Sequence, residues 1–63
     1  MHIEEIVLKR LDSRWDCVIY FRVLGRDGQT LPLAASSQGR LVCLAYWRAL
    51  RAAKRKRDAF SYH

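Results

Sequence analysis

A run of strand-forming residues extends from Trp15 to Leu24 (WDCVIYFRVL) and limits the folds open to this chain. β-Branched and aromatic side chains dominate this run, and such side chains favour a pleated, half-buried backbone. Turn residues bound it on both sides, with Asp12-Ser13-Arg14 before it and Gly25-Arg26-Asp27-Gly28 after it. Asp-Gly in the second turn supplies the positive φ that tight hairpins require. The sequence therefore predicts a strand that belongs to an antiparallel sheet.

The segments on either side of this run are predicted to be its neighbouring strands. Residues 3–11 (IEEIVLKRL) fit either a helix or a strand, and the strong strand next to them favours the strand. A third strand is expected from about Gln29 to Ala34. It contains Pro32, which cannot donate to a ladder of hydrogen bonds, so this strand belongs on an edge of the sheet. The run from Trp15 to Leu24 then takes the middle place.

The rest of the chain predicts one long helix from about Gln38 to Phe60, rich in Ala, Leu, Arg and Lys, with Ser36 or Ser37 as its cap. At about 100° per residue this helix has a continuous apolar arc that would face the sheet. The arc contains Leu41, Val42, Cys43, Ala45, Tyr46, Ala49, Leu50, Ala52 and Ala53. Because the helix would outrun the shortest strand, the basic run 54–57 is expected to project past the sheet.

The predicted fold class is therefore α+β, a three-stranded antiparallel meander packed against one long C-terminal α-helix (β-β-β-α). Residues 1–63 form one small domain, in which 54–63 are the basic end of the helix and a tail.

The whole net charge of +6 lies in residues 40–63, because acidic and basic side chains balance in residues 1–39. The basic residues of this block are Arg40, Arg48, Arg51, Lys54, Arg55, Lys56 and Arg57. Solubility alone, an acidic protein partner and a phosphate-binding surface would each account for a basic helix face. A block of one sign most often indicates nucleic acid. The sequence thus predicts a small basic nucleic-acid-binding protein, in which Trp47 stacks or packs beside Arg51.

A second surface is predicted on the sheet face that the helix does not cover. Along the central strand, Cys17, Ile19, Phe21 and Val23 alternate with Val18, Tyr20, Arg22 and Leu24. One helix covers one face only, so the second set is expected to form an exposed protein interface. Through it the chain would form a homodimer or a hetero-complex. Isolated surface hydrophobes are the alternative interpretation.

Several functional classes are excluded by what the sequence lacks. Cys17 and Cys43 show no metal-ligand spacing with each other or with the terminal His2 and His63, and two buried free thiols in a cytoplasmic protein are expected, with one disulfide as the alternative. No catalytic or nucleotide-binding motif is present, so we expect a non-enzyme without cofactor or metal. The uncharged segment 41–47 is far shorter than the roughly 20 residues that span a bilayer, and residues 1–10 lack an apolar export segment.

Four local features carry a resemblance to known DNA-binding domains. They are Ser13-Arg14-Trp15 at the start of the second strand, Arg22 near its end, the Gly-Arg-Asp-Gly hairpin, and a short third strand that leads through Ser36-Ser37 into a helix. Over roughly residues 5–57 the chain resembles the arm-binding domains of tyrosine recombinases and plant AP2 domains. This resemblance implies that the sheet enters the major groove through Lys9 or Arg10, Arg14, Arg22 and Arg26. In this chain the basic residues favour the helix instead.

In its size and its lack of catalytic motifs, the chain is also similar to small proteins of phages and mobile elements, including anti-CRISPR proteins. That similarity implies an alternative function. The chain would be an inhibitor that binds a host complex through the apolar sheet face and the basic helix.

Overall fold

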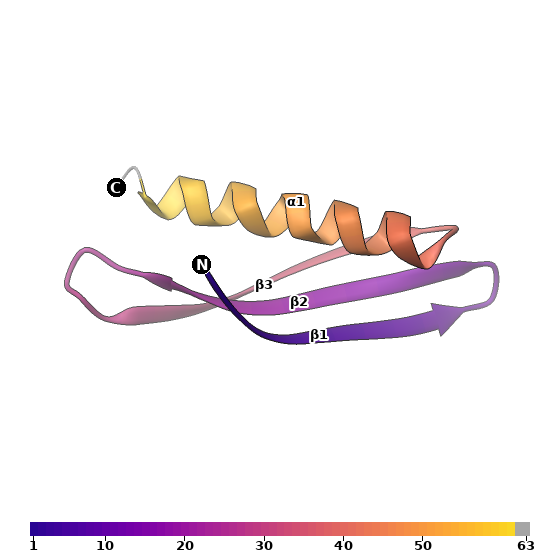
Figure 1. Cartoon of the computed structure of the whole chain (residues 1–63), viewed down its shortest axis with the longest axis horizontal. Coiled ribbons are helices and arrows are strands. Elements are labelled where there is room, and N and C mark those ends of the chain that lie inside the picture. Colours follow the sequence, from indigo (N-terminus) through magenta and orange to yellow (C-terminus); the bar gives the residue numbers. More distant parts are fainter. Residues whose placement is uncertain (62–63) are drawn as a thin grey trace.

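The computed structural model describes residues 1–61, and its elements follow the order β-β-β-α (Figure 1). The strands β1 (His2–Leu11), β2 (Arg14–Leu24) and β3 (Thr30–Gly39) are followed by one helix, α1 (Val42–Ser61). The strands pair antiparallel in the order β1-β2-β3. The predicted fold class is confirmed, as are the central place of β2 and the edge place of the strand that contains Pro32.

The two hairpin turns differ slightly from the predicted ones. Arg14 already pairs with Leu11, so β1 and β2 are joined by two residues rather than three. In the second turn Gly28 has a φ of 83°, as the Asp-Gly sequence predicted. The backbone N–H of Gly25 donates to the Gln29 carbonyl at 2.7 Å and closes this turn. A glycine is required at position 28 because other residues rarely adopt a positive φ.

The third strand is longer than predicted, and the predicted helix cap is wrong. Ser36 and Ser37 lie within β3, opposite Val18 and Cys17 of β2. The extension of β3 pairs residues 15–18 of β2, whose backbone groups on this side an earlier helix would leave without a strand partner. The helix begins only at Val42, after Leu41, whose carbonyl accepts the first helical hydrogen bond from Ala45 N at 3.1 Å. No polar side chain therefore occupies the cap position.

Gly39 allows the chain to reverse from β3 into α1 at close range. A Cβ at this position would lie 2.8 Å from Ala45 N and 2.9 Å from Leu44 Cβ. Both distances are well below van der Waals contact, so a larger residue would push the start of the helix away from the strand.

The core is a layer of alanines on the sheet. Ala45, Ala49 and Ala53 of α1 are buried against Cys17, Ile19, Phe21, Val23 and Ala35. Small side chains let the helix approach the strands closely, and the predicted inward face of β2 is confirmed. At the start of the predicted apolar arc the prediction is wrong, because Leu41, Val42 and Cys43 are exposed. The late start of the helix leaves these three residues at the margin of the core.

The basic run 54–57 lies over the sheet and does not project past it. Lys56 Nζ donates a hydrogen bond to the Ala34 carbonyl of β3. Figure 1 shows the last turns of α1 above the strands, with the β2–β3 turn reaching further. The prediction was wrong because it assumed a third strand that ends at Ala34, whereas the ten residues of β3 match the length of the helix.

The two thiols have different environments. Both cysteines are free, but Cys17 is buried in the core and Cys43 is exposed, so the prediction of two buried thiols holds for Cys17 only. Burial raises the pKa of the Cys17 thiol, and the neighbouring Asp16 carboxylate raises it further. Since the thiolate is the reactive form, Cys17 is protected by both its pKa and its position.

We expect a thiol-specific disulfide reagent at neutral pH to modify one thiol of the native chain rapidly and the second slowly, with both thiols reacting rapidly after denaturation. Cys43→Ser should abolish the rapid phase and leave the slow one. Absorbance stopped-flow would resolve the two phases, and two equally fast phases in the native wild-type chain would contradict the buried position of Cys17.

Candidate nucleic-acid interface

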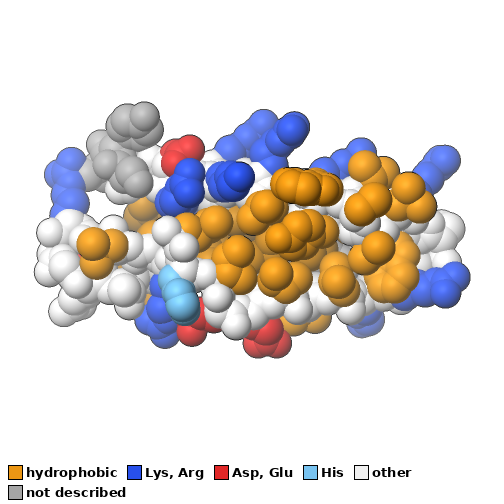
Figure 2. Space-filling view, viewed as in Figure 1, with side chains coloured by type: hydrophobic (Ala, Val, Ile, Leu, Met, Phe, Trp, Pro, Cys, Tyr) orange, Lys and Arg blue, Asp and Glu red, His pale blue; other side chains and the backbone are white. Residues whose placement is uncertain are grey.

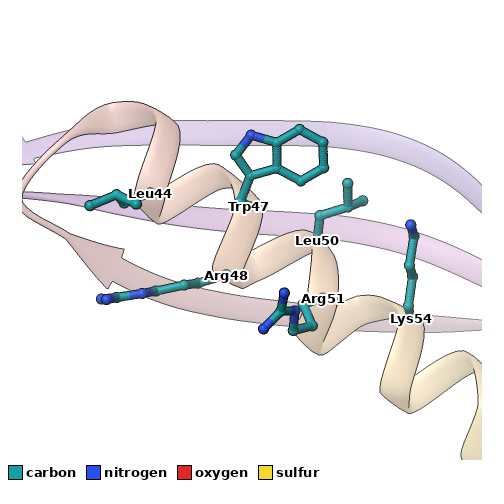
Figure 3. Close-up of a pocket in the computed structure, with 6 residues that line it drawn as sticks. All are labelled: Leu44, Trp47, Arg48, Leu50, Arg51 and Lys54. Atoms are coloured by element: carbon teal, nitrogen blue, oxygen red, sulfur yellow. The ribbon is translucent and has the colours of Figure 1, made fainter.

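A shallow groove of about 390 Å³ lies along the outer side of α1. It is lined by Leu44, Trp47, Arg48, Leu50, Arg51 and Lys54 (Figure 3). In Figure 3, Trp47, Leu50 and Lys54 project from one side of the helix and Arg48 from the other. The groove thus combines three apolar side chains with three cationic ones.

Trp47 is the most exposed aromatic side chain at this groove, with 62% of its surface accessible. The half-buried Tyr46 ring meets the indole edge to face, with ring centroids 5.8 Å apart and planes at 66°. Arg51 follows Trp47 at i+4, a spacing that places two side chains next to each other on a helix. The indole is therefore both oriented by a neighbouring ring and accessible to solvent.

Three cations of the outer helix face are available to a ligand. Arg51, Lys54 and Arg55 are exposed and make no hydrogen bond or ion pair with any other residue in the described chain. They occupy neighbouring turns of α1, so their charges form one ridge. An exposed ridge of like charge with no internal partner is typical of a surface that attracts anions.

The other predicted cations of α1 have partners within the chain. Arg48 Nη1 donates to the Gln38 carbonyl at 3.0 Å, and Lys56 donates to the Ala34 carbonyl. Both acceptors belong to β3, the strand along which α1 lies. Arg57 Nε pairs with Asp58 Oδ1 at 3.1 Å. Arg48 and Lys56 therefore hold α1 on β3 as well as carrying charge, whereas the exposed Arg57–Asp58 pair lies within the helix and contributes little to stability.

Arg40 lies apart from the helical ridge, in a second hollow beside the start of α1. This hollow has a volume of about 250 Å³ and is lined by Ser13, Arg14, Gln38, Gly39, Arg40 and Arg48. Arg14 comes from the first residue of β2 and is held by Gln38 Oε1 at 3.1 Å. Arg48 lines both hollows, so it links the two cationic regions. The place of Arg14 beside Arg40 was missed by the sequence analysis, because it depends on β3 reaching as far as Gly39.

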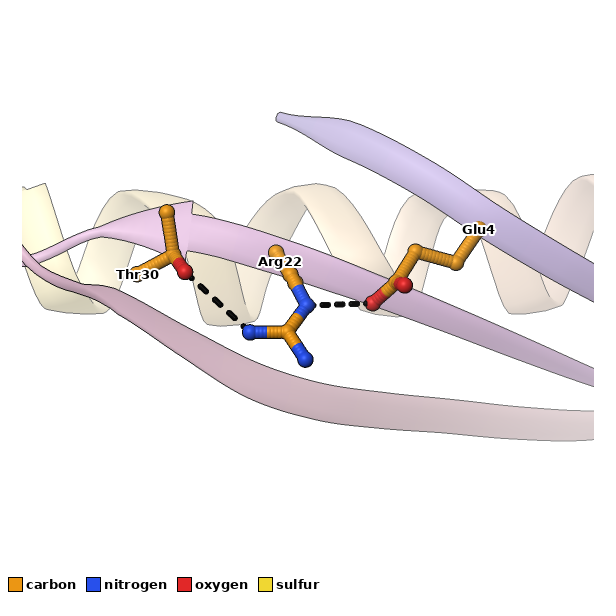
Figure 4. A network of polar contacts seen from close by, with 3 residues as sticks. All are labelled: Glu4, Arg22 and Thr30. Atoms are coloured by element: carbon orange, nitrogen blue, oxygen red, sulfur yellow. Dashed lines mark hydrogen bonds and ion pairs between the residues drawn. The ribbon is translucent and has the colours of Figure 1, made fainter.

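The predicted protein interface on the open sheet face is exposed but mixed in character. Val18 is half-buried, whereas Tyr20 and Leu24 are exposed, with 72% of the Leu24 surface accessible. Arg22 lies across this face and connects all three strands (Figure 4). Its Nε donates to Glu4 Oε1 at 2.7 Å and its Nη1 to Thr30 Oγ1 at 3.1 Å. The guanidinium is therefore occupied within the chain.

A further apolar surface, which the sequence analysis missed, lies on the helix side of the sheet. Figure 2 shows hydrophobic side chains gathered in a band between α1 and β1, below a row of Lys and Arg. Exposed members are Ile6 and Leu8 of β1 and Leu44 and Trp47 of α1. The band exists because α1 packs on β2 and β3 and leaves β1 largely uncovered. No periodicity within a single element could have indicated this offset.

Some classes of site are absent from the described residues. Within residues 1–61, no three His, Cys, Asp or Glu side chains come together as a metal site, and α1 lacks the apolar length needed to cross a membrane. His63, at the end of the chain, lies outside the described residues.

Comparison with protein-family models, with curated proteins and with solved structures found no match to this chain. The resemblance to recombinase and AP2 domains therefore stays a prediction.

Proposed function

We propose that this chain is a small non-enzymatic nucleic-acid-binding protein that holds an unpaired strand along α1. The observation that carries the proposal is the exposed Trp47 indole in one groove with Arg51 and Lys54. Proteins that bind single strands combine a cationic track for the phosphates with aromatic side chains for the bases. A flat indole among cations meets both requirements.

The arrangement of charge on α1 supports contact with the phosphate backbone of the nucleic acid rather than with the edges of its bases. Arg51, Lys54 and Arg55 follow one another along the helix, so they would contact successive phosphates beside a base stacked on Trp47. The hollow that Arg14 and Arg40 line would extend the track beyond the start of α1. Phosphate and stacking contacts are largely independent of sequence, and we therefore propose binding without strong sequence preference.

The test is a fluorescence titration with the Trp15→Phe variant, in which Trp47 is the remaining tryptophan. We expect oligothymidylate to quench Trp47 emission, and a duplex of equal length to quench it less, because paired bases cannot stack on the indole. For three contacts to single-stranded phosphates, log K should fall with log salt at a slope near −2. Trp47→Ala should weaken binding about 5- to 150-fold, as expected for the loss of one stacked base.

Absence of binding to any single- or double-stranded DNA or RNA at low salt would contradict the proposal. Binding without quenching would retain the cationic track and remove the stacking role of Trp47.

A second candidate function is direct inhibition of a protein complex, of the kind that small phage proteins carry out. It is favoured by Tyr20 and Leu24, which stand exposed on the open sheet face and could anchor a partner. In this case α1 would steer association through its charge. A chain that binds no nucleic acid in the titration above would leave this second function in place.

A further inference from the structure

The two edges of the sheet differ in whether their outward backbone N–H and C=O groups are blocked from pairing with a further strand. On β3, Pro32 lacks an N–H group, and Arg48 and Lys56 donate to the Gln38 and Ala34 carbonyls. A proline and side chains that occupy the edge carbonyls hinder a further strand from pairing with this edge. Within residues 1–61, no side chain forms a hydrogen bond with the backbone of β1. The backbone groups along the edge of β1 are therefore open to pairing with a further strand.

The side chains of β1 determine which further strand can pair with this edge. Ile6 and Leu8 pair with Ile19 and Cys17 of β2, so they lie on the helix side of the sheet, where α1 leaves them 40% and 46% exposed. Val7 lies on the opposite face and is 38% exposed. The middle of β1 thus has exposed apolar side chains on both faces, with Glu5 and Lys9 beside Val7 on the open face, and such an edge can pair with a strand whose side chains match it.

The sequence of β1 is complementary to itself when two copies run antiparallel about Val7. In this register Val7 meets Val7 of the second copy, Ile6 meets Leu8, and Glu5 meets Lys9. Opposite residues of an antiparallel pair share one face, and both apolar pairs and pairs of opposite charge stabilise it. Each of the unlike pairs occurs twice, because the arrangement has a twofold axis.

Neighbouring registers that keep the same faces together lack this complementarity. Centring the pair on Ile6 would place Val7 opposite Glu5, and centring it on Leu8 would place Val7 opposite Lys9. Either shift buries an apolar side chain against a charge. The regular part of β1 also suits the Val7 register, since the bulge falls between Ile3 and Glu5, outside the segment 5–9.

We propose that two copies of this chain associate through β1, antiparallel and centred on Val7, to form a continuous six-stranded sheet. The twofold axis is then perpendicular to the sheet, so both α1 helices lie on the same face and present their cationic ridges on one side. The interface differs from the open face of Val18, Tyr20, Arg22 and Leu24 on which the sequence analysis placed a dimer. It does not depend on nucleic-acid binding.

The test is a charge exchange between Glu5 and Lys9, read by sedimentation equilibrium at low salt. The wild-type chain should have twice the monomer mass of 7.4 kDa. Glu5→Lys or Lys9→Glu alone turns two attractive pairs into two repulsive ones, and each should weaken dimerisation by roughly tenfold or more. An equimolar mixture of the two variants restores both unlike pairs, so it should form a heterodimer about as stable as the wild type.

The matched controls are Asp27→Lys and Arg26→Glu in the β2–β3 turn, which change the charge equally without touching β1 and should leave the dimer intact. Circular dichroism should report a folded chain for each variant. If a charge variant does not fold, Val7→Arg replaces it, because this change places two like charges at the twofold axis on an exposed position. A monomeric wild-type chain at millimolar concentration, or a dimer insensitive to all these β1 changes, would overturn the proposal.

Discussion

Arg51→Gln combined with Lys54→Gln is expected to weaken binding to oligothymidylate about 60-fold at 50 mM salt. Each phosphate contact to a single strand adds about 0.7 to the dependence of log K on log salt, so two lost contacts remove nearly two decades of affinity at this concentration. The salt slope should become shallower by about 1.4 for the same reason. Fluorescence anisotropy of a labelled oligonucleotide measures both quantities.

The matched control is Arg10→Gln combined with Arg26→Gln, which removes the same charge from residues outside the groove. In this control the affinity for the oligonucleotide should fall only a few-fold, because only the general attraction between a basic chain and an anion is reduced. If both pairs of substitutions weaken binding equally, net charge accounts for the affinity, and the ridge on α1 is not the binding surface. Gln keeps a long side chain with good helix propensity, so α1 should persist in the first variant.

Phe21→Ala is expected to leave the chain largely unfolded. Phe21 is the largest fully buried side chain and lies on β2 beneath α1. Removing a buried Phe side chain costs about 3–5 kcal/mol, whereas a chain of 63 residues has a total stability of only about 3–9 kcal/mol. Thermal unfolding followed by circular dichroism should show a fall in Tm of at least about 12 °C, or no cooperative transition.

Tyr20→Ala is the matched control for this prediction, because it removes a neighbouring ring from the open face of the same strand. Tyr20 is exposed, so the Tm should fall far less. Both variants must be compared at one protein concentration, because self-association makes Tm depend on concentration. A larger fall in Tm for Tyr20→Ala than for Phe21→Ala would mean that the core lies on the opposite face of the sheet, which would contradict the burial of Phe21.

Much of the fold could be predicted from local patterns. The alternation in residues 15–24 correctly separated the inward Ile19 and Phe21 from the outward Tyr20, because successive strand residues point to opposite faces. Pro32 correctly placed the third strand on an edge. The helical periodicity also placed Ala45, Ala49 and Ala53 within a wider apolar arc, of which they are the fully buried part. Each of these features depends on a few neighbouring residues, which is why the sequence alone was sufficient.

The candidate site was predicted less completely. The sequence indicated which residues are basic but not which cations have partners inside the chain. Arg48 and Lys56 donate to β3 carbonyls, and these contacts require β3 and α1 to lie side by side. The gathering of Arg14 and Arg40 in one hollow likewise requires the end of β3 to meet the start of β2.

Local sequence patterns were enough to predict the order of elements, the buried face of β2, the alanines that α1 buries, and the concentration of charge at the C-terminal end. The tertiary structure decided where β3 ends, how far α1 is offset from β1, and therefore which surfaces stay exposed. The physical reason is that strand length follows from the hydrogen bonds a neighbouring strand can offer, and helix position follows from how closely alanines pack on the sheet. Both depend on residues distant in the chain, and together they leave the edge of β1 and the ridge of Arg51, Lys54 and Arg55 open to partners.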